Sequence, residues 1–404
     1  MTQTRRLTTH RDIQPTACPM TTALENVSRP LATSQGAAGL RAGSHGSQPR
    51  RKGWRASLLT LVVLVASLPA GSPVPGAGVA CGQGPVPLAA DPLTEAAVVA
   101  KVEKTLDRSL KYLASKQLPD GGWHNNQAVN GLTVLAFLGR GHVPGRGPYA
   151  EVLENAKRAI LRGQNDKGLF GGTMYEHGIA TLAVSELYGM DPDPLLEERL
   201  RKAVALIVSA QSPAGGWRYN PTPTDQDLSV TVVQIVALRA ANNAEIEVPA
   251  QVIDKAIGYI RACVVENGGG QGYQGKGGRT PQTTAAGIVS LQLLGQYDDP
   301  SIPPALEFLN KVPIEWKGGQ VNYFYYFHYY AIQAQYQTGG ESWNAWHPKI
   351  RELLFSRQNG DGSWDVPEGT AEQSGTVGPN KVYWTAMASL ILEIYMHYLP
   401  AYQR

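Results

Sequence analysis

The segment Gln211-Ser-Pro-Ala-Gly215-Gly-Trp217 decides the fold, because the chain repeats it. Its form is Gln-x3-Gly-x-aromatic, and the further copies are Gln117–Trp123, Gln164–Phe170 and Gln358–Trp364. The first three copies begin at residues 117, 164 and 211, which is a spacing of 47. Two degenerate copies, 266–273 and 317–323, lie between Trp217 and Gln358 and are the fourth and fifth in chain order, so six units span about 300 residues. A period of this length indicates a repeat fold.

Each unit pairs two helical patterns around its glycine-rich motif. Before the first motif, Val102, Leu106, Leu110 and Leu113 recur at helical spacing, which predicts an amphipathic helix. The glycines end that helix, because glycine adopts the left-handed backbone that a helix end needs. Segments apolar on all sides follow the motifs, at 131–138, 178–187, 230–241 and 284–294. A helix that is apolar on all sides must be buried.

These hairpins predict an all-α fold. Six units with no strand pattern favour two concentric rings, with the apolar helices inside and the amphipathic helices outside. This arrangement is an α/α toroid. An open solenoid is the alternative, but it needs polar capping repeats at its ends, which the sequence lacks.

The N-terminal region has a different composition. Residues 1–55 are rich in Ser, Thr, Gly, Pro and Arg, which predicts a disordered leader. A basic flank then precedes an apolar run, and 56–80 is interpreted as a signal peptide or an N-terminal anchor. Residues 81–94 form a linker, and the repeat domain covers 95–404. We therefore expect an exported or periplasmic protein that contacts a membrane only through this segment, if at all.

Charge and cysteine content exclude several classes of protein. Residues 1–81 hold nine basic and two acidic residues, so the formal charge of +3 leaves a balance of −4 on the remainder. An acidic body disfavours a nucleic-acid partner, which would need a basic surface. The chain has three cysteines, too few for a disulfide framework or a cysteine-rich zinc site. We expect no metal and no cofactor. The sequence leaves the oligomeric state open.

The repeated motif resembles the QW motif of squalene–hopene cyclases and of the related prenyltransferase β subunits. The resemblance covers about residues 95–400, and the segments 176–181 and 383–400 are also similar to uncharacterised exported bacterial members of this superfamily. It implies the α/α-toroid fold and a structural role for the Gln and Trp residues of the motif. By the same resemblance, a zinc-dependent prenyltransferase would need an Asp-x-Cys pair after 268–278, and Thr280-Pro-Gln-Thr stands there instead.

The resemblance also points to one acidic motif. Class II terpene cyclases protonate an olefin with the middle Asp of Asp-x-Asp-Asp, and Asp225-Gln-Asp227-Leu228 is the nearest match. Asp227 aligns with the proton donor, but Leu228 replaces the last Asp. A proton donor needs a raised pKa. Asp227 also directly precedes an apolar helix, and as its N-cap the side chain would have a lowered pKa.

A second set of candidates follows from the expected ring. If all hairpins run alike, the N-termini of the inner helices meet at one end of the ring, where their partial positive charge suits an anion or a polar ligand end. His177 is the other candidate acid or base. The candidate ligand-binding residues are Asp225, Tyr175, Tyr326, His328, Tyr383 and Trp384. Residues 321–330 hold seven aromatics, which predicts either an aromatic cavity wall or a helix packed on both sides.

Two classes of function stay open. The first is a ligand- or partner-binding toroid without cyclase activity, whose ligand is an isoprenoid or other lipid, a glycan or a peptide. The alternative is a terpene-cyclase-type enzyme that starts its reaction with an acid, Asp227 or His177. The missing Asp at position 228 and the single barrel favour binding, whereas the aromatic segment and the His and Asp residues favour an enzyme.

Overall fold

The structure is a computed structural model that describes residues 92–266, 269–319, 321–374 and 380–394. Contacts between Cα atoms divide the chain into two units, Met1–Gln83 and Gly84–Arg404, and the described residues belong to the second unit. The expected leader and the signal or anchor segment, 1–55 and 56–80, lie outside the described residues. Among the described helices, none combines the length and the apolar character needed to cross a membrane.

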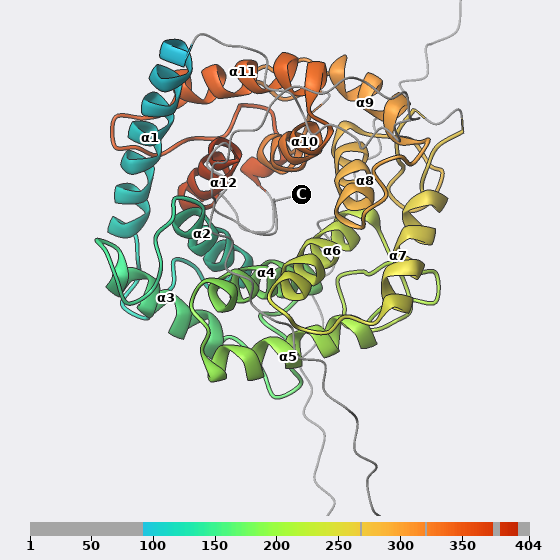
Figure 1. The fold of residues 1–404 in the computed structure, drawn as a ribbon, viewed down its shortest axis with the longest axis horizontal. Coiled ribbons are helices and arrows are strands. Elements are labelled where there is room, and N and C mark those ends of the chain that lie inside the picture. The colour runs from blue at the N-terminus through green and yellow to red at the C-terminus, as the bar shows by residue number, and fades with distance from the viewer. Residues whose placement is uncertain (1–91, 267–268, 320, 375–379, 395–404) are drawn as a thin grey trace, which may run out of the picture. The chain divides into compact units, whose positions relative to one another are not determined.

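Twelve α-helices and no strand make up the described part of the chain, arranged in two rings (Figure 1). The even-numbered helices form the inner ring and the odd-numbered helices the outer ring. This confirms the predicted α/α toroid. The helices are α1 (Pro92–Ser115), α2 (Gln127–Gly139), α3 (Ala150–Arg162), α4 (Met174–Met190), α5 (Pro194–Ser209), α6 (Leu228–Asn243), α7 (Ala250–Ala262), α8 (Pro281–Leu293), α9 (Ile302–Asn310), α10 (Phe324–Thr338), α11 (Gly340–Arg357) and α12 (Lys381–Glu393), with a short 3-10 turn at Ala371–Gln373.

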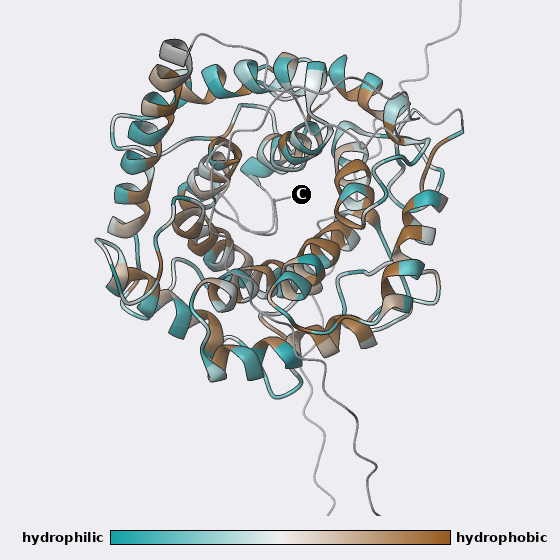
Figure 2. Ribbon diagram, in the orientation of Figure 1, coloured by the Kyte–Doolittle hydropathy of each residue, from teal (hydrophilic) through white to brown (hydrophobic). Residues whose placement is uncertain are grey.

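Burial separates the two rings as the sequence pattern predicts. Helix α6 is buried from Leu228 to Leu238 on every side. Helix α3 buries only a stripe that includes Leu153, Ala156 and Ile160, and its other face meets solvent. Figure 2 shows the same contrast, with mostly apolar inner helices and two-faced outer helices. Apolar burial of this extent is the main stabilising contribution to such a fold.

The repeated Gln and Trp side chains join successive helices. The Gln211 amide donates to the carbonyl of Gly215 at 2.9 Å and to that of Val252, in the next outer helix, at 2.8 Å. Gln117 and Gln164 repeat the pattern on α3 and α5. The buried Trp217 indole donates back to the Ile207 carbonyl at 2.7 Å. These contacts confirm that the repeated residues are structural.

The last copy of the motif closes the ring. Gln358 donates to the carbonyl of Thr105 in α1 at 2.9 Å, across almost the whole repeat domain. Gly362 lies against α1 with φ of +93°, and an added Cβ would stand 2.4 Å from the Arg108 carbonyl oxygen. Only glycine fits this approach. Helix α12 packs on α1 and α2, so the structure is a closed toroid and not an open solenoid.

The degenerate fourth copy has a different register from the one expected. In the complete copies, the backbone N–H of the motif aromatic donates to a side chain of the following inner helix, as Trp217 does to Thr231 at 3.0 Å. In the fourth copy, Gln271 makes this bond, to Thr284 at 3.3 Å. Gln271 therefore takes the place of the aromatic residue, and Tyr273 corresponds to Tyr219.

Candidate functional site

Asp227 is the N-cap of inner helix α6 and is fully buried. Its Oδ1 accepts hydrogen bonds from the Val230 backbone N–H at 2.9 Å and from the Ser229 hydroxyl at 2.6 Å. No group among the described residues donates a hydrogen bond to its Oδ2. The capping role expected from the sequence is confirmed, and it engages only one of the two carboxylate oxygens.

Arg218 lies between the two acidic residues of the motif. Its Nε is 3.4 Å from Oδ2 of the exposed Asp225 and 3.7 Å from Oδ2 of Asp227. The guanidinium also lies over the rings of Tyr219 and Tyr273, at 5.7 and 5.9 Å. The hydroxyls of these two tyrosines are 3.3 Å apart. Within this set of side chains around Arg218, Asp225 lies at the exposed edge and Asp227 lies at the buried end.

The pKa of Asp227 is raised above its usual value, contrary to the lowering that a helix N-cap implies. Burial is the largest cause, because it penalises the charged form. The hydrogen bonds from Ser229 and Val230, the charge of Arg218 and the nearby Tyr273 hydroxyl all lower this pKa without cancelling the effect of burial. The carboxyl group is therefore easier to protonate than an exposed one.

Five partly exposed tyrosines interact electrostatically with Tyr326 or are Tyr326 itself, and Tyr326 also interacts with Asp227. We call them the tyrosine cluster: Tyr175, Tyr219, Tyr273, Tyr326 and Tyr383. Burial raises the pKa of Tyr326, and the charge of Asp227 adds to the shift. Tyr175, Tyr326 and Tyr383 act on one another electrostatically. The structure thus brings four predicted site residues together, namely Asp227, Tyr175, Tyr326 and Tyr383.

Glu372 is a second buried carboxyl group near the cluster, and no sequence pattern pointed to it. Its two oxygens accept the backbone N–H groups of Tyr325 and Tyr326, both at 3.0 Å, at the start of α10. Burial raises its pKa to about 7, although these hydrogen bonds lower it. Tyr383 lies within reach of its charge.

The structure engages His177 in the scaffold. Its Nδ1 accepts the backbone N–H of Phe170 at 3.0 Å, and its Nε2 lies 3.2 Å from the Ala203 carbonyl. Asn130 and Thr231 accept the corresponding N–H groups in other repeats, so His177 fills a recurring structural position. Burial lowers its pKa to about 4, which makes the ring neutral at pH 7. Both ring nitrogens thus have backbone partners.

His328 and Trp384 lie apart from the cluster contacts. The His328 ring packs against Phe324 and Phe327 and against Trp346 of outer helix α11, and burial lowers its pKa to about 3. Trp384 is buried in α12. Helix α10 is mostly packed on both sides, with Tyr326 as its partly exposed aromatic at the cluster.

Sequence reasoning missed Arg218, Tyr219 and Tyr273. A sequence signal for them exists: Tyr219 lies two residues after the motif residue Trp217. The carbonyls of Tyr219 and Tyr273 both accept the first backbone N–H of the preceding inner helix, so the two tyrosines have the same role in successive repeats. This role recurs once the fourth copy is aligned on Gln271. The described residues hold no group of three or more His, Cys, Asp or Glu side chains that could bind a metal, and Cys263 is a buried free thiol.

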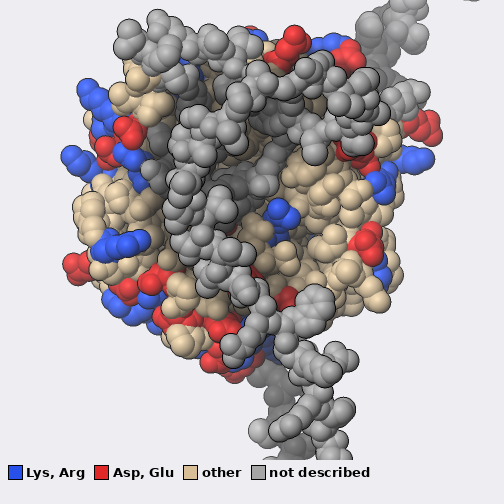
Figure 3. All heavy atoms as spheres, viewed as in Figure 1, with Lys and Arg blue, Asp and Glu red and all other residues tan. Residues whose placement is uncertain are grey.

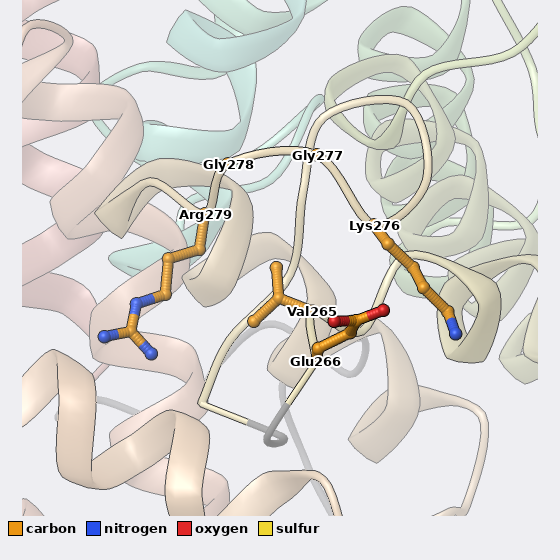
Figure 4. Close-up of a pocket in the computed structure, with 6 residues that line it drawn as sticks. All are labelled: Val265, Glu266, Lys276, Gly277, Gly278 and Arg279. Carbon is orange, nitrogen blue, oxygen red and sulfur yellow. The ribbon is translucent and has the colours of Figure 1, made fainter.

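A separate hollow lies at the glycine-rich loop between α7 and α8, lined by Val265, Glu266, Lys276, Gly277, Gly278 and Arg279 (Figure 4). The Arg279 guanidinium lies 4.2 Å over the Phe308 ring and donates to the Gly269 carbonyl at 2.6 Å. On the face shown in Figure 3, acidic and basic side chains of the described residues are interspersed around the periphery.

Comparisons with known proteins place the fold. No protein-family model and no curated protein matches the chain. Among solved structures, an aspartate-to-alanine variant of the type II terpene cyclase MstE from Scytonema, in complex with merosterolic acid A, is 16% identical with a TM-score of 0.52. The matched region covers 73% of this chain and 97% of the cyclase chain. The GH76A α-1,6-mannanase from Salegentibacter sp. HEL1_6 is 10% identical with a TM-score of 0.55, over 72% of this chain and 98% of its own.

An inactive variant of that mannanase in complex with α-1,6-mannotriose is 12% identical, with a TM-score of 0.54 over 72% and 98% of the two chains. At these identities the likeness extends to the fold alone. The chain shares the α/α-toroid fold with terpene cyclases and with glycosidases.

Proposed function

We propose that this protein is an exported toroid that binds a ligand at the tyrosine cluster and has no cyclase activity. The observation that carries the proposal is Asp227 Oδ2, a fully buried carboxylate oxygen without a hydrogen-bond donor among the described residues. Arg218 Nε, at 3.7 Å, is beyond hydrogen-bond distance of this oxygen, so a ligand that donates a hydrogen bond to it gains affinity. Export rests on the basic and apolar pattern before residue 81.

The absence of cyclase chemistry rests on three features. Leu228 stands where a second adjacent Asp is expected, Oδ1 of Asp227 is committed to the helix cap, and Arg218 lies 3.7 Å from Oδ2. A nearby guanidinium favours the charged carboxylate and opposes its use as an acid. His177 has both ring nitrogens bonded to backbone groups, so we assign it no acid–base role.

The test is native mass spectrometry of the full chain purified from its own host, with extraction and identification of bound small molecules. We expect a co-purifying ligand that is depleted in Asp227→Asn and retained in Asp193→Asn. Asp193 is a matched control, because it caps outer helix α5 by accepting the Leu195 N–H at 2.8 Å. A chain without ligand, or a ligand retained equally by both variants, would contradict the proposal.

The raised pKa of Asp227 favours a second candidate, an enzyme that starts its reaction by protonating a ligand. Geranylgeranyl dihydroxybenzoate, the substrate bound by MstE, is a suitable probe. Conversion by the wild-type chain and loss of conversion in Asp227→Asn, with folding intact, would establish the enzyme. Binding without conversion supports the binding protein.

A further inference from the structure

The N-termini of the inner helices are already satisfied by their neighbours. In four of them, the first backbone N–H groups donate to the next repeat, at 2.7 to 3.0 Å. The bonds run from Gln127 to Glu176 Oε2, from Met174 to the Tyr219 carbonyl, from Leu228 to the Tyr273 carbonyl, and from Tyr325 and Tyr326 to Glu372. The N–H groups that bind anions at helix N-termini are therefore occupied here.

Three of these N-termini carry a carboxylate. Glu176 accepts from α2, Asp227 from α6 and Glu372 from α10. Each occupies the place where an anionic ligand would benefit from the helix dipole. The converging N-termini were expected to suit an anion or a polar ligand end. Because the protein supplies anions of its own at three of them, an anionic ligand is disfavoured and a polar ligand is favoured.

The nearby arginine does not restore an anion site. Arg218 lies 3.4 Å from one carboxylate, of Asp225, and 3.7 Å from the other, of Asp227. Two acidic neighbours offset its single charge. A phosphate placed here would meet like charges that cost about as much as the arginine contributes.

The polar groups left for a ligand include both hydrogen-bond donors and hydrogen-bond acceptors. Three buried atoms have no hydrogen-bond partner among the described residues: Asp227 Oδ2, an acceptor with Arg218 Nε 3.7 Å away; Arg218 Nη1, a donor; and the Tyr326 hydroxyl, which is either. The tyrosine cluster adds ring faces beside them. A hydrocarbon would leave these polar atoms unpaired, which costs free energy for each atom. Several hydroxyl groups on one rigid ring can donate and accept at once.

We infer that the ligand is an uncharged ring compound rich in hydroxyl groups, which is the chemistry of a neutral glycan. The inference rests on the proposed ligand-binding function and narrows its ligand class. Tyrosine faces stack on the apolar faces of sugar rings, while Asp227, Arg218 and Tyr326 bond the hydroxyl groups. A site built to bond hydroxyl groups discriminates strongly against ligands that lack them.

Isothermal titration calorimetry on the full chain tests this inference. The neutral probes are the tetrasaccharides α-1,6-mannotetraose, maltotetraose, cellotetraose and galactotetraose, and the anionic probe is tetragalacturonate. Geranylgeraniol and geranylgeranyl diphosphate represent isoprenoids. We expect at least one neutral tetrasaccharide to bind, tetragalacturonate to bind at least about tenfold more weakly than that tetrasaccharide, and geranylgeranyl diphosphate not to bind.

Variants locate the site. Asp227→Asn keeps the cap oxygen but replaces the free acceptor by a donor, so the affinity for the bound tetrasaccharide falls at least about tenfold. Asp193→Asn leaves the affinity unchanged. Binding that both variants leave unchanged would overturn the site and the inference.

The remaining outcomes separate the inference from the proposed function. A chain that binds either isoprenoid in an Asp227-dependent manner, and none of the neutral tetrasaccharides, overturns the glycan class and leaves ligand binding intact. A chain that binds no probe and carries no co-purifying ligand overturns both. Preferential binding of tetragalacturonate overturns the argument from the occupied N-termini.

Discussion

Asp227, at the start of inner helix α6, and Asp299, in the loop before outer helix α9, occupy the same local setting. Each is buried, each lies two residues before a serine, and each accepts that serine's hydroxyl at 2.6 Å through Oδ1. They differ at Oδ2. Arg261 donates to Asp299 Oδ2 at 2.8 Å, whereas the corresponding oxygen of Asp227 has no donor among the described residues.

The two carboxyl groups have pKa shifts in opposite directions. Burial raises both pKa values, but in Asp299 the hydrogen bonds from Ser301 and Arg261 outweigh burial, and the pKa ends below its usual value. In Asp227 burial prevails and the pKa is raised. Both oxygens of Asp299 thus have hydrogen-bond donors, whereas Oδ2 of Asp227 can still accept a hydrogen bond from a ligand.

The largest expected effect is the loss of stability caused by a substitution at Asp299. Asp299→Ala removes the partner of Ser301 and of Arg261, and we expect the free energy of unfolding to fall by about 2–3 kcal/mol. Urea unfolding followed by circular dichroism measures it. A loss smaller than that of Asp227→Ala would reverse the comparison.

Asp227→Ala has a smaller expected effect on stability. It removes an N-cap, which costs about 1 kcal/mol, and it also relieves a buried carboxyl whose second oxygen is unpaired. Asp227→Asn changes stability by less than about 0.5 kcal/mol, because Asn caps as well as Asp. The same urea titration serves both variants. A loss in Asp227→Asn as large as that in Asp299→Ala would show that Asp227 is fully satisfied too.

The pH dependence of stability has opposite signs at the two sites. Asp227 has a raised pKa, so its contribution is fully present below its usual value of 3.8 and is lost as the pH rises through the folded pKa. Asp299 has a lowered pKa, so its contribution is present above 3.8 and is lost as the pH falls through the folded pKa. On acidification, wild type gains stability relative to Asp227→Asn and loses it relative to Asp299→Asn. Unfolding curves at several pH values compare them, and the same sign at both sites would contradict the structure.

The smallest expected effect on ligand affinity is that of a substitution at His177. His177→Asn keeps an acceptor for the Phe170 N–H, as Asn130 does for Trp123, and loses the contact with Ala203. We expect a loss of about 1 kcal/mol of stability and an affinity for the ligand within about twofold of wild type. Calorimetry on the folded variant measures the affinity. A tenfold change in affinity would show that His177 belongs to the binding site.

The scaffold was predictable because its signals are local and repeated. Gln211 and Trp217 recur with fixed spacing, and each repeat buries the same apolar helix, so periodicity alone predicts hairpins and a ring. The cap at Asp227 was equally visible, since a polar residue before an apolar helix has one common role. The degenerate copies were harder, because Gln271 replaces the aromatic residue and shifts the apparent alignment by two residues.

The site was predictable only in part. Tyr175, Tyr326 and Tyr383 followed from the expectation that inner-helix N-termini share one end of the ring. Glu372 did not, because nothing near it in sequence marks it as the cap of α10. His177 looked reactive in isolation, and only its bonds to Phe170 and Ala203 show it as a structural link.

The sequence by itself determined the repeat, the all-α class, the closed ring and the cap at Asp227. These depend on neighbours along the chain and on a period that many residues report together. Only the tertiary structure decided which polar atoms are satisfied: it gave Asp299 an arginine, left Asp227 Oδ2 without a hydrogen-bond donor, and covered the N-termini of α2 and α10 with carboxylates from the next repeat. A pKa and a binding preference depend on burial and on partners distant in sequence, and no local pattern encodes either.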